Sequence, residues 1–390
     1  MALEFKQNDA DALREYFEGR EGEVLSLVRA LVETESPSGD LEGNAAVVSL
    51  LAEAARSIDI DAEVTLESDA VYGAHITIRA FGRDNEHAPA TLILGHTDTV
   101  HPRGSIAARP WREEEGRIYG PGIFDMKANC ALALESLRAC ATLGLRPSNP
   151  VVILLTCDEE VGSQSGRALV EAAARRAAHV LVFEPSAPGG RAKTARKGTS
   201  SYTVRVEGRA AHAGLEPEKG VSAILEIARQ IERIHSLGDA ARGVTVNAGV
   251  VSGGTRSNVV AAEARTEVDV RFSTLEDALR MEEKMLNLRP FDERVKLSVE
   301  GGINRPPLER SDAVVALYEH ARRMAALLDF DLGETSVGGA SDGNFAAAVG
   351  ATVLDGLGIA GDGAHASHEH IDRADIARRG ALLAGLLVTL

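Results

Sequence analysis

The sequence is short of cysteine, of positive charge and of long apolar runs. Its three cysteines form no CxxC pair, which excludes a disulfide framework. The 42 basic residues are outnumbered by 58 acidic ones, and the net charge of −16 disfavours nucleic acid, whose phosphates need a basic surface. No apolar run reaches the roughly 18 residues of a membrane span. The N-terminal segment has no apolar signal core, so we expect a cytoplasmic protein without a membrane partner.

Buried strands and helices alternate through the first half of the chain. Wholly apolar runs, which indicate buried strands, occur at 90–95, 151–157 and 179–183. Helical spacing of apolar residues occurs at 10–33, 127–143 and 163–176. This alternation is typical of an α/β layered fold.

The pattern changes at about residue 195 and changes back after residue 307. Between these points the chain predicts strand, helix, strand, strand, helix and strand, at 199–207, 218–236, 244–252, 259–272, 274–286 and 294–300. The order βαββαβ is that of the split-βαβ sandwich. Since helices and a strand follow it, we predict one discontinuous domain, 1–194 and 308–390, interrupted by a separate domain, 195–307.

Five short motifs lie at the ends of the predicted buried strands or in the loops after them, where open α/β sheets bind ligands. They are GHTDTV, GPGIFDMK, DEE, EPS and GAHASHEH, which start at 95, 120, 158, 184 and 363. His96 and Asp98 point the same way along a strand, so Asp98 can hold the imidazole tautomer that leaves one nitrogen free for a metal. The three carboxylates of 158–160 repel one another by about 1–4 kcal/mol per pair at contact, and a divalent cation removes that repulsion.

Each motif also has a simpler interpretation. These interpretations are a surface His–Asp pair, an N-cap aspartate, a solvated loop, a turn cap and a group of surface histidines. Together, however, the motifs supply histidines and several carboxylates in strand order. This mixed nitrogen and oxygen set suits zinc, manganese or cobalt.

In their order and spacing, HTDTV, GPGIFDMK, DEEVGS, FEPS and GAHASHE closely resemble the signatures of the dizinc aminoacylase and carboxypeptidase family. That family includes acetylornithine deacetylase, succinyl-diaminopimelate desuccinylase and the folate-cleaving glutamate carboxypeptidases. The resemblance covers essentially the whole chain. It implies an α/β catalytic domain of the three-layer zinc-exopeptidase type with a mixed sheet, interrupted by a ferredoxin-like dimerisation (lid) domain at 195–307.

The resemblance also implies a metal site. Asp125 would bridge two zinc ions per subunit, for which cobalt or manganese are substitutes. The remaining ligands would be His96 and Glu184 for one ion, and Glu160 and His365 for the other.

Further residues receive roles by the same resemblance. Glu159 would be the general base, because it precedes the ligand glutamate, and Asp98 would orient His96. In the inserted domain and the glycine-rich loop 338–344, the residues expected to hold the oxyanion or the substrate are His212, Asn258, Arg271 and Gly339. The inserted domain would also form a homodimer.

The chain departs from the family pattern at two places. Ala128–Asn129 follows DMK, where two glycines are common, and His370 stands where an aromatic residue is usual. His368 lies close enough to His365 to leave open which histidine binds metal. The family also has a cis peptide bond after the bridging aspartate, here Asp125–Met126.

The resemblance predicts hydrolysis of the amide bond between an acyl group and a C-terminal amino acid. The spacing of His212, Asn258 and Arg271 resembles that of carboxypeptidases which release glutamate from N-acyl or folate-like substrates. Three alternatives stay open: a deacylase of the acetylornithine or succinyl-diaminopimelate type, a small-peptide dipeptidase, and a metal-stabilised amino-acid-binding protein without activity. In each case the partner is a small molecule or peptide with a free carboxylate.

Overall fold

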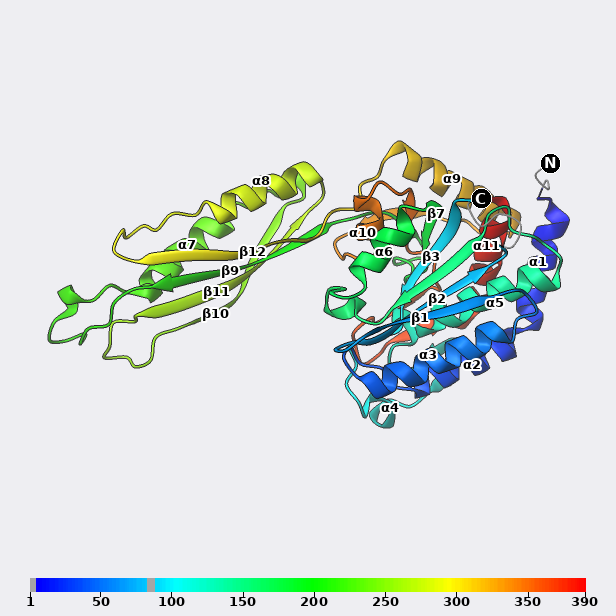
Figure 1. The fold of residues 1–390 in the computed structure, drawn as a ribbon, viewed down its shortest axis with the longest axis horizontal. Helices are drawn as coiled ribbons and strands as arrows, with labels where there is room; N and C mark the ends of the chain where they lie inside the picture. Colours follow the sequence, from blue (N-terminus) through cyan, green and yellow to red (C-terminus); the bar gives the residue numbers. More distant parts are fainter. Residues whose placement is uncertain (1–4, 83–87) are drawn as a thin grey trace. The chain divides into compact units, whose positions relative to one another are not determined.

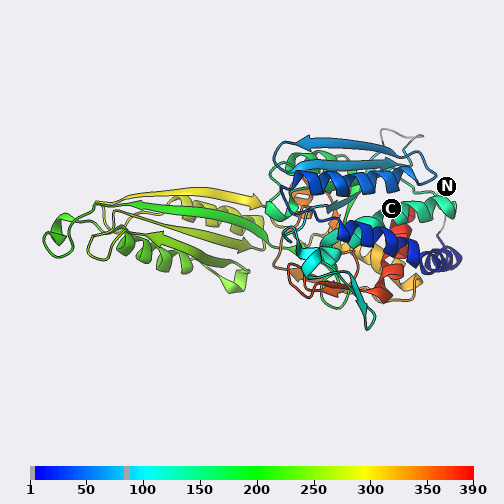
Figure 2. The ribbon, with the colours of Figure 1, turned by 90° about the horizontal axis from the view of Figure 1, so that it is seen from below.

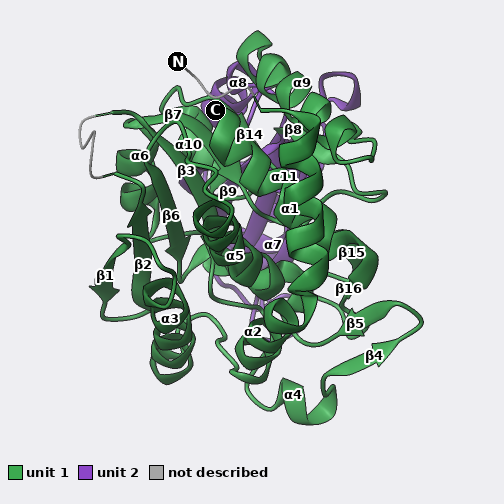
Figure 3. Ribbon diagram, turned by 90° about the vertical axis from the view of Figure 1, so that its right-hand side faces the viewer, with its two compact units in different colours: residues 1–195, 310–337, 341–390 green, residues 196–309, 338–340 purple. Residues whose placement is uncertain are grey.

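The computed structural model describes residues 5–82 and 88–390 (Figure 1). The chain forms two compact units (Figure 3). Unit 1 contains Met1–Ala195, Arg310–Val337 and Ser341–Leu390. Unit 2 contains Arg196–Glu309 and Gly338–Ala340. Among the described residues, no helix combines the length and the apolarity that crossing a bilayer requires.

Unit 1 is built on a six-stranded sheet in the order β1-β2-β6-β3-β7-β14. The strands are Glu63–Asp69, Gly73–Ala80, Val151–Thr156, Ala90–His96, Ala177–Val182 and Val353–Leu354, in that order. The last four are parallel to one another, whereas β1 and β2 are antiparallel to their neighbours. The predicted mixed sheet is thus confirmed, and its parallel centre is the part that is apolar throughout, because both faces are covered.

Helices cover both faces of this sheet (Figure 3). The larger core lies under α1, α2, α3, α5 and α11, which span Gln7–Gly19, Glu21–Glu33, Leu41–Arg56, Ala128–Thr142 and Ile376–Thr389. The shorter helices α6 (Arg167–Ala174) and α10 (Gly343–Ala348) lie against β7 on the other side. The remaining helices are α4 (Ser105–Ala108) and α9 (Asp312–Leu327). The layered α/β class predicted from the sequence is confirmed.

Two features of unit 1 differ from the sequence-based expectation. The helical segment expected at 10–33 divides at Arg20, between Gly19 and Gly22, where the backbone leaves helical geometry. Several very short strands were not predicted, because two to five residues give too little alternation to detect. They are β4 (Arg112–Glu114), β5 (Arg117–Tyr119), β8 (Ala192–Arg196), β13 (Glu334–Val337), β15 (Gly361–Asp362) and β16 (His370–Asp372).

Unit 2 is an antiparallel four-stranded sheet with two helices on one face (Figure 2). The sheet order is β10-β11-β9-β12, with strands Thr245–Gly253, Glu263–Phe272, Gly198–Glu207 and Lys296–Arg305. The helices are α7 (Ala223–His235) and α8 (Leu275–Leu286), so the chain order is βαββαβ as predicted. Helix α7 begins five residues later than expected, because Ser222 caps it by accepting a hydrogen bond from Leu225 N.

The packing of α1 on α11 yields a stability prediction. A Cβ atom added at Gly380 would lie 2.3 Å from Phe17 Cε1, and Phe17 is fully buried. Overpacking costs about 1–3 kcal/mol, more than the ~1 kcal/mol that alanine gains over glycine in a helix. We therefore expect Gly380→Ala to lower the thermal unfolding midpoint.

The matched control for this change is Gly22→Ala, since nothing lies within 4 Å of a Cβ placed there. That variant should keep or raise the midpoint. Phe17→Leu in the Gly380→Ala background should recover part of the loss. Equal midpoints for the two glycine variants would contradict the packing argument.

Candidate metal centre

Polar side chains gather where the buried parallel strands of unit 1 end. His96 is the last residue of β3, the turn 159–161 follows β6, and Glu184 follows β7. Because the carboxyl ends of neighbouring parallel strands meet at one edge of a sheet, ligands bind there. The first polar residues at the ends of these apolar strands therefore lie at the same edge of the sheet.

The first ligand group contains His96, Asp125 and Glu184, whose candidate ligand atoms all lie within 4.8 Å of one another. His96 Nε2 is 3.1 Å from Asp125 Oδ1 and 3.4 Å from Glu184 Oε1. The imidazole is 1% exposed. One nitrogen and two carboxylates therefore converge in a site that is largely closed to solvent.

The second ligand group contains Asp125, Glu160 and His365. His365 Nε2 is 3.4 Å from Asp125 Oδ2 and 3.1 Å from Glu160 Oε2. Asp125 thus turns one carboxylate oxygen toward each group. The geometry brings together all five residues expected as ligands, and it places the shared aspartate between the two groups.

Three carboxylates share this small volume with two imidazoles. Burial raises the pKa of Glu160. Burial also opposes ionisation of Asp125, but contacts with His365 and His96 outweigh it and lower its pKa. Contacts with Asp125 and Glu160 raise the pKa of His365 to about 10. The carboxylates therefore favour positive charge at this place, and a cation that binds there displaces the imidazole protons.

The residues fit a pair of divalent cations. Glu160 Oε1 is buried and accepts no hydrogen bond, which is costly for a carboxylate oxygen unless a cation satisfies it. Mixed imidazole and carboxylate donors suit zinc, cobalt and manganese. The Asp125–Met126 peptide bond is cis, as predicted.

Asp98 has more contacts than the sequence indicated. Its backbone carbonyl is 2.9 Å from His96 Nδ1, closer than its carboxylate oxygen Oδ1 at 3.4 Å. The carboxylate instead accepts hydrogen bonds from Ser38 Oγ at 2.6 Å and from the N–H groups of Glu159 and Glu160, each at 3.2 Å. Asp98 therefore fixes both the imidazole and the turn that carries Glu159.

Glu159 is the chain neighbour of Glu160 and belongs to neither ligand group. It is 8% exposed and opens the turn after β6, next to the ligand candidate Glu160. Ser38, which anchors Asp98, was missed from the sequence. Nothing in the local sequence shows that its hydroxyl reaches a residue sixty positions away.

The other expected substrate residues belong to unit 2. His212 pairs with Val259 in an isolated bridge, and Ala213 N donates to Asn258 O at 3.0 Å, so these two segments run side by side. Arg271 Nε donates to Asp269 Oδ1 at 2.8 Å. The carbonyl of Gly339 accepts from Arg196 Nη1 at 3.2 Å.

Both departures from the family pattern have structural counterparts. Asn129 Oδ1 accepts a hydrogen bond from Ile359 N at 2.9 Å, which ties the start of α5 to the segment after β14. The centre of the His370 ring lies 5.1 Å from the centre of the Tyr119 ring. The histidine thus makes the kind of ring contact that the usual aromatic residue would make at this position. His368 belongs to none of the ligand groups among the described residues.

A third group of possible ligands is already satisfied by hydrogen bonds. It contains His75, Cys157 and Asp158, all buried. Cys157 N donates to His75 Nδ1 at 3.2 Å, and Asp158 accepts from Ser165 and Gly166. Burial raises the pKa of the Cys157 thiol and so disfavours its thiolate form. We assign this group to structure.

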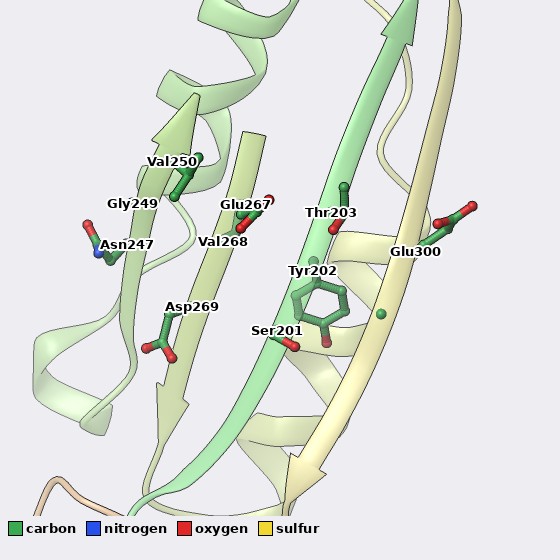
Figure 4. Close-up of a pocket in the computed structure, with 11 residues that line it drawn as sticks. Ser201, Tyr202, Thr203, Asn247, Gly249, Val250, Glu267, Val268, Asp269 and Glu300 are labelled. Carbon is green, nitrogen blue, oxygen red and sulfur yellow. The ribbon is translucent and has the colours of Figure 1, made fainter. Parts of the chain in front are cut away.

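Unit 2 has a hollow of about 430 Å³ on its sheet (Figure 4). Its lining includes three carboxylates, Glu267, Asp269 and Glu300. Like charges repel an anionic ligand. This hollow therefore disfavours anionic ligands.

Comparison with known proteins adds independent findings. The family model described as peptidase family M20/M25/M40 matches residues 92–389. Carboxypeptidase G2 of Pseudomonas sp. (strain RS-16) is 31% identical over 380 residues, which covers 94% of this chain and 89% of the relative.

Solved structures share the fold. Aminopeptidase PepT from Bacillus cereus superposes with a TM-score of 0.76 at 22% identity, covering 95% of this chain and 98% of that chain. Bacillus subtilis YXEP, described as a dinuclear metal-binding peptidase of the M20 family, gives a TM-score of 0.68 at 14% identity, covering 95% and 98%.

The geometry distinguishes the two neighbouring histidines. His365 contacts two carboxylates of the second group, whereas His368 contacts none of the ligand candidates. We expect His365→Ala to reduce the metal content of the protein by one divalent cation per chain, as measured by elemental analysis after dialysis. His368→Ala is the matched control and should retain the full content. Loss of a cation in the His368 variant alone would reverse the assignment.

Proposed function

The chain belongs to peptidase family M20/M25/M40, a family of metal-dependent hydrolases, and from this premise we propose that it is a dinuclear zinc carboxypeptidase. Its proposed reaction is hydrolysis of the amide bond between an acyl group and a C-terminal amino acid, with glutamate as the product. The observation that carries the proposal is the pair of ligand groups that share Asp125, with Glu159 next in the chain to Glu160 and outside both groups. Cobalt and manganese suit the same donors.

Two arguments support the choice of substrate. The curated relative at 31% identity is named a carboxypeptidase. The spacing of His212, Asn258 and Arg271 resembles that of carboxypeptidases that release glutamate. The glutamate assignment rests on that resemblance and is the first thing to test.

The chain's own residues supply the proton transfers. When bound, the two cations polarise the scissile carbonyl and bring the pKa of water toward neutrality. Glu159 takes one proton from the attacking water and delivers it to the leaving amine nitrogen as the carbon–nitrogen bond breaks. Asp98 keeps this base in place, because it accepts hydrogen bonds from the N–H groups of Glu159 and Glu160.

Residues of unit 2 are proposed to bind the substrate. His212 stabilises the oxyanion, Asn258 contacts the substrate carbonyl, and Gly339 lines the pocket. Arg271 binds the free carboxylate as a bidentate pair. Asp269 engages Arg271 Nε, and a guanidinium carries further N–H donors on its two Nη atoms for a second carboxylate.

A homodimer through unit 2 is also part of the proposal. Strand β10 is an edge of its sheet, and unpaired edges are templates for pairing with another chain. Apolar side chains are exposed there, with Val251 at 62% and, on the adjacent helix α7, Leu225 at 54%. An apolar edge of this kind supports pairing with a second copy.

The substrate prediction is tested by product analysis. Zinc-loaded protein should release glutamate from pteroyl-glutamate faster than it releases amine from acetylornithine, succinyl-diaminopimelate or a dipeptide. Protein treated with a chelator serves as the control and should release none. Preferred cleavage of acetylornithine or succinyl-diaminopimelate would assign a deacylase, and preferred cleavage of the dipeptide would assign a dipeptidase. Metal binding without turnover of any substrate would favour a binding protein.

The role of Glu159 is tested separately. Because it lies outside both ligand groups, Glu159→Ala should keep both cations while kcat falls by about 10²–10⁴-fold, the usual contribution of a positioned base. Glu160→Ala should lose a cation instead, and Glu171→Ala, on the surface helix α6, should change neither. Turnover close to wild type in the Glu159 variant would refute the role.

A further inference from the structure

Glu369 has no part in the chemistry proposed above, yet its carboxylate is buried, with 2% of the residue exposed. Four donors surround it. Oε1 accepts from the N–H groups of Phe124 at 2.9 Å and Asp125 at 3.0 Å. Oε2 accepts from Gly122 N at 2.8 Å and lies 2.5 Å from His101 Nε2. Three of these donors belong to the loop that presents Asp125.

This loop takes its shape around the carboxylate. Successive backbone N–H groups that converge on one anion form a nest, and hydrogen bonds to a charged acceptor are stronger than neutral ones. Gly122 has φ +71°, a left-handed conformation that glycine adopts without strain. Because the N–H of Asp125 is one of the donors, the carboxylate fixes the residue that both ligand groups share.

The same network reaches the segment that carries His365. Arg109 donates from Nη1 to the carbonyl of Ala366 at 3.2 Å, and its Nη2 lies 3.2 Å from His101 Nδ1. Arginine can only donate, so His101 Nδ1 is an acceptor and its Nε2–H donates to Glu369. These contacts link Ala366 to Arg109, Arg109 to His101, and His101 to Glu369. Because Ala366 and Glu369 belong to the chain segment that carries His365, the contacts form a closed ring next to it.

We propose that Glu369 is a positioning residue for the second divalent cation, the one held by Asp125, Glu160 and His365. This inference rests on the proposed dinuclear site. The second group takes two of its three ligands, Asp125 and His365, from the two segments that Glu369 ties together. The first group takes only Asp125 from them. Loss of the carboxylate therefore weakens the binding of the second cation more than the binding of the first.

The test is Glu369→Gln, which keeps the shape of the side chain and removes one acceptor. The amide NH₂ would face either the Gly122 and His101 donors or the Phe124 and Asp125 donors, so one pair of hydrogen bonds is lost in each orientation. Zn²⁺ titration of metal-free protein by calorimetry should show one site weakened about 10–100-fold, as is usual for residues that support metal ligands. The other site should change by a few-fold at most. The absorption spectrum of Co²⁺-loaded protein reports the same loss independently of activity.

Glu135→Gln is the matched control. Glu135 is also a buried glutamate of unit 1, at 8% exposure, and it accepts from Tyr16 and Arg20. Its substitution should lower the unfolding midpoint and leave both cation affinities unchanged. His101→Phe removes one of the four donors to Glu369 and should weaken cation binding at the same second site by a smaller factor. This variant tests the role of Glu369 if Glu369→Gln does not fold.

The outcomes separate the two proposals. Wild-type protein that binds fewer than two cations would overturn the proposed function itself. Wild-type protein with two cations, and a Glu369→Gln variant with two unchanged affinities, would overturn only the role of Glu369. Equal weakening of both sites would also overturn it, because the inference requires the second site to be the more sensitive.

Discussion

The constraint on which the rest of unit 1 depends is the confinement of several negatively charged carboxylates in a small volume. Asp125 and Glu160 are set against His96 and His365, and Glu160 keeps a buried oxygen without a hydrogen bond. Such a cluster lowers the stability of the fold unless something compensates for its charge, because each buried carboxylate must be paired with a cation or accept hydrogen bonds. A divalent cation would offset this electrostatic cost, and membership of a family of metal-dependent peptidases agrees with a metal at this place.

Two buried carboxylates that are not ligands hold this cluster together. Asp98 joins the end of β3 to the turn after β6, and Glu369 joins the loop before α5 to the segment that carries His365. Both accept backbone N–H groups, so they fix the main chain and thereby the direction of the side chains. Outer residues of this kind orient the ligands and tune the affinity for metal, and the site is therefore larger than its five ligand candidates.

Local patterns in the sequence were enough for the fold class. Apolar runs predicted the buried parallel strands, and the change of pattern after residue 195 predicted the βαββαβ order found in unit 2. The same patterns failed where an element is too short to show a period, as in β15, or where two helices join end to end at Arg20. Ser38 and Glu369 were missed for a different reason, because a polar residue in a loop carries no local sign of a distant partner.

By itself the sequence determined the layered α/β class, the mixed nitrogen and oxygen donors, and the resemblance that led to the family. These depend on residue type and on spacing along the chain, which are local properties. Only the tertiary structure decided that Asp125 turns one oxygen to each ligand group, that His365 rather than His368 joins the second group, and that Asp98 supports the turn of Glu159. Those relations join residues up to 240 positions apart, and they exist only once the strands have brought their ends to one edge of the sheet.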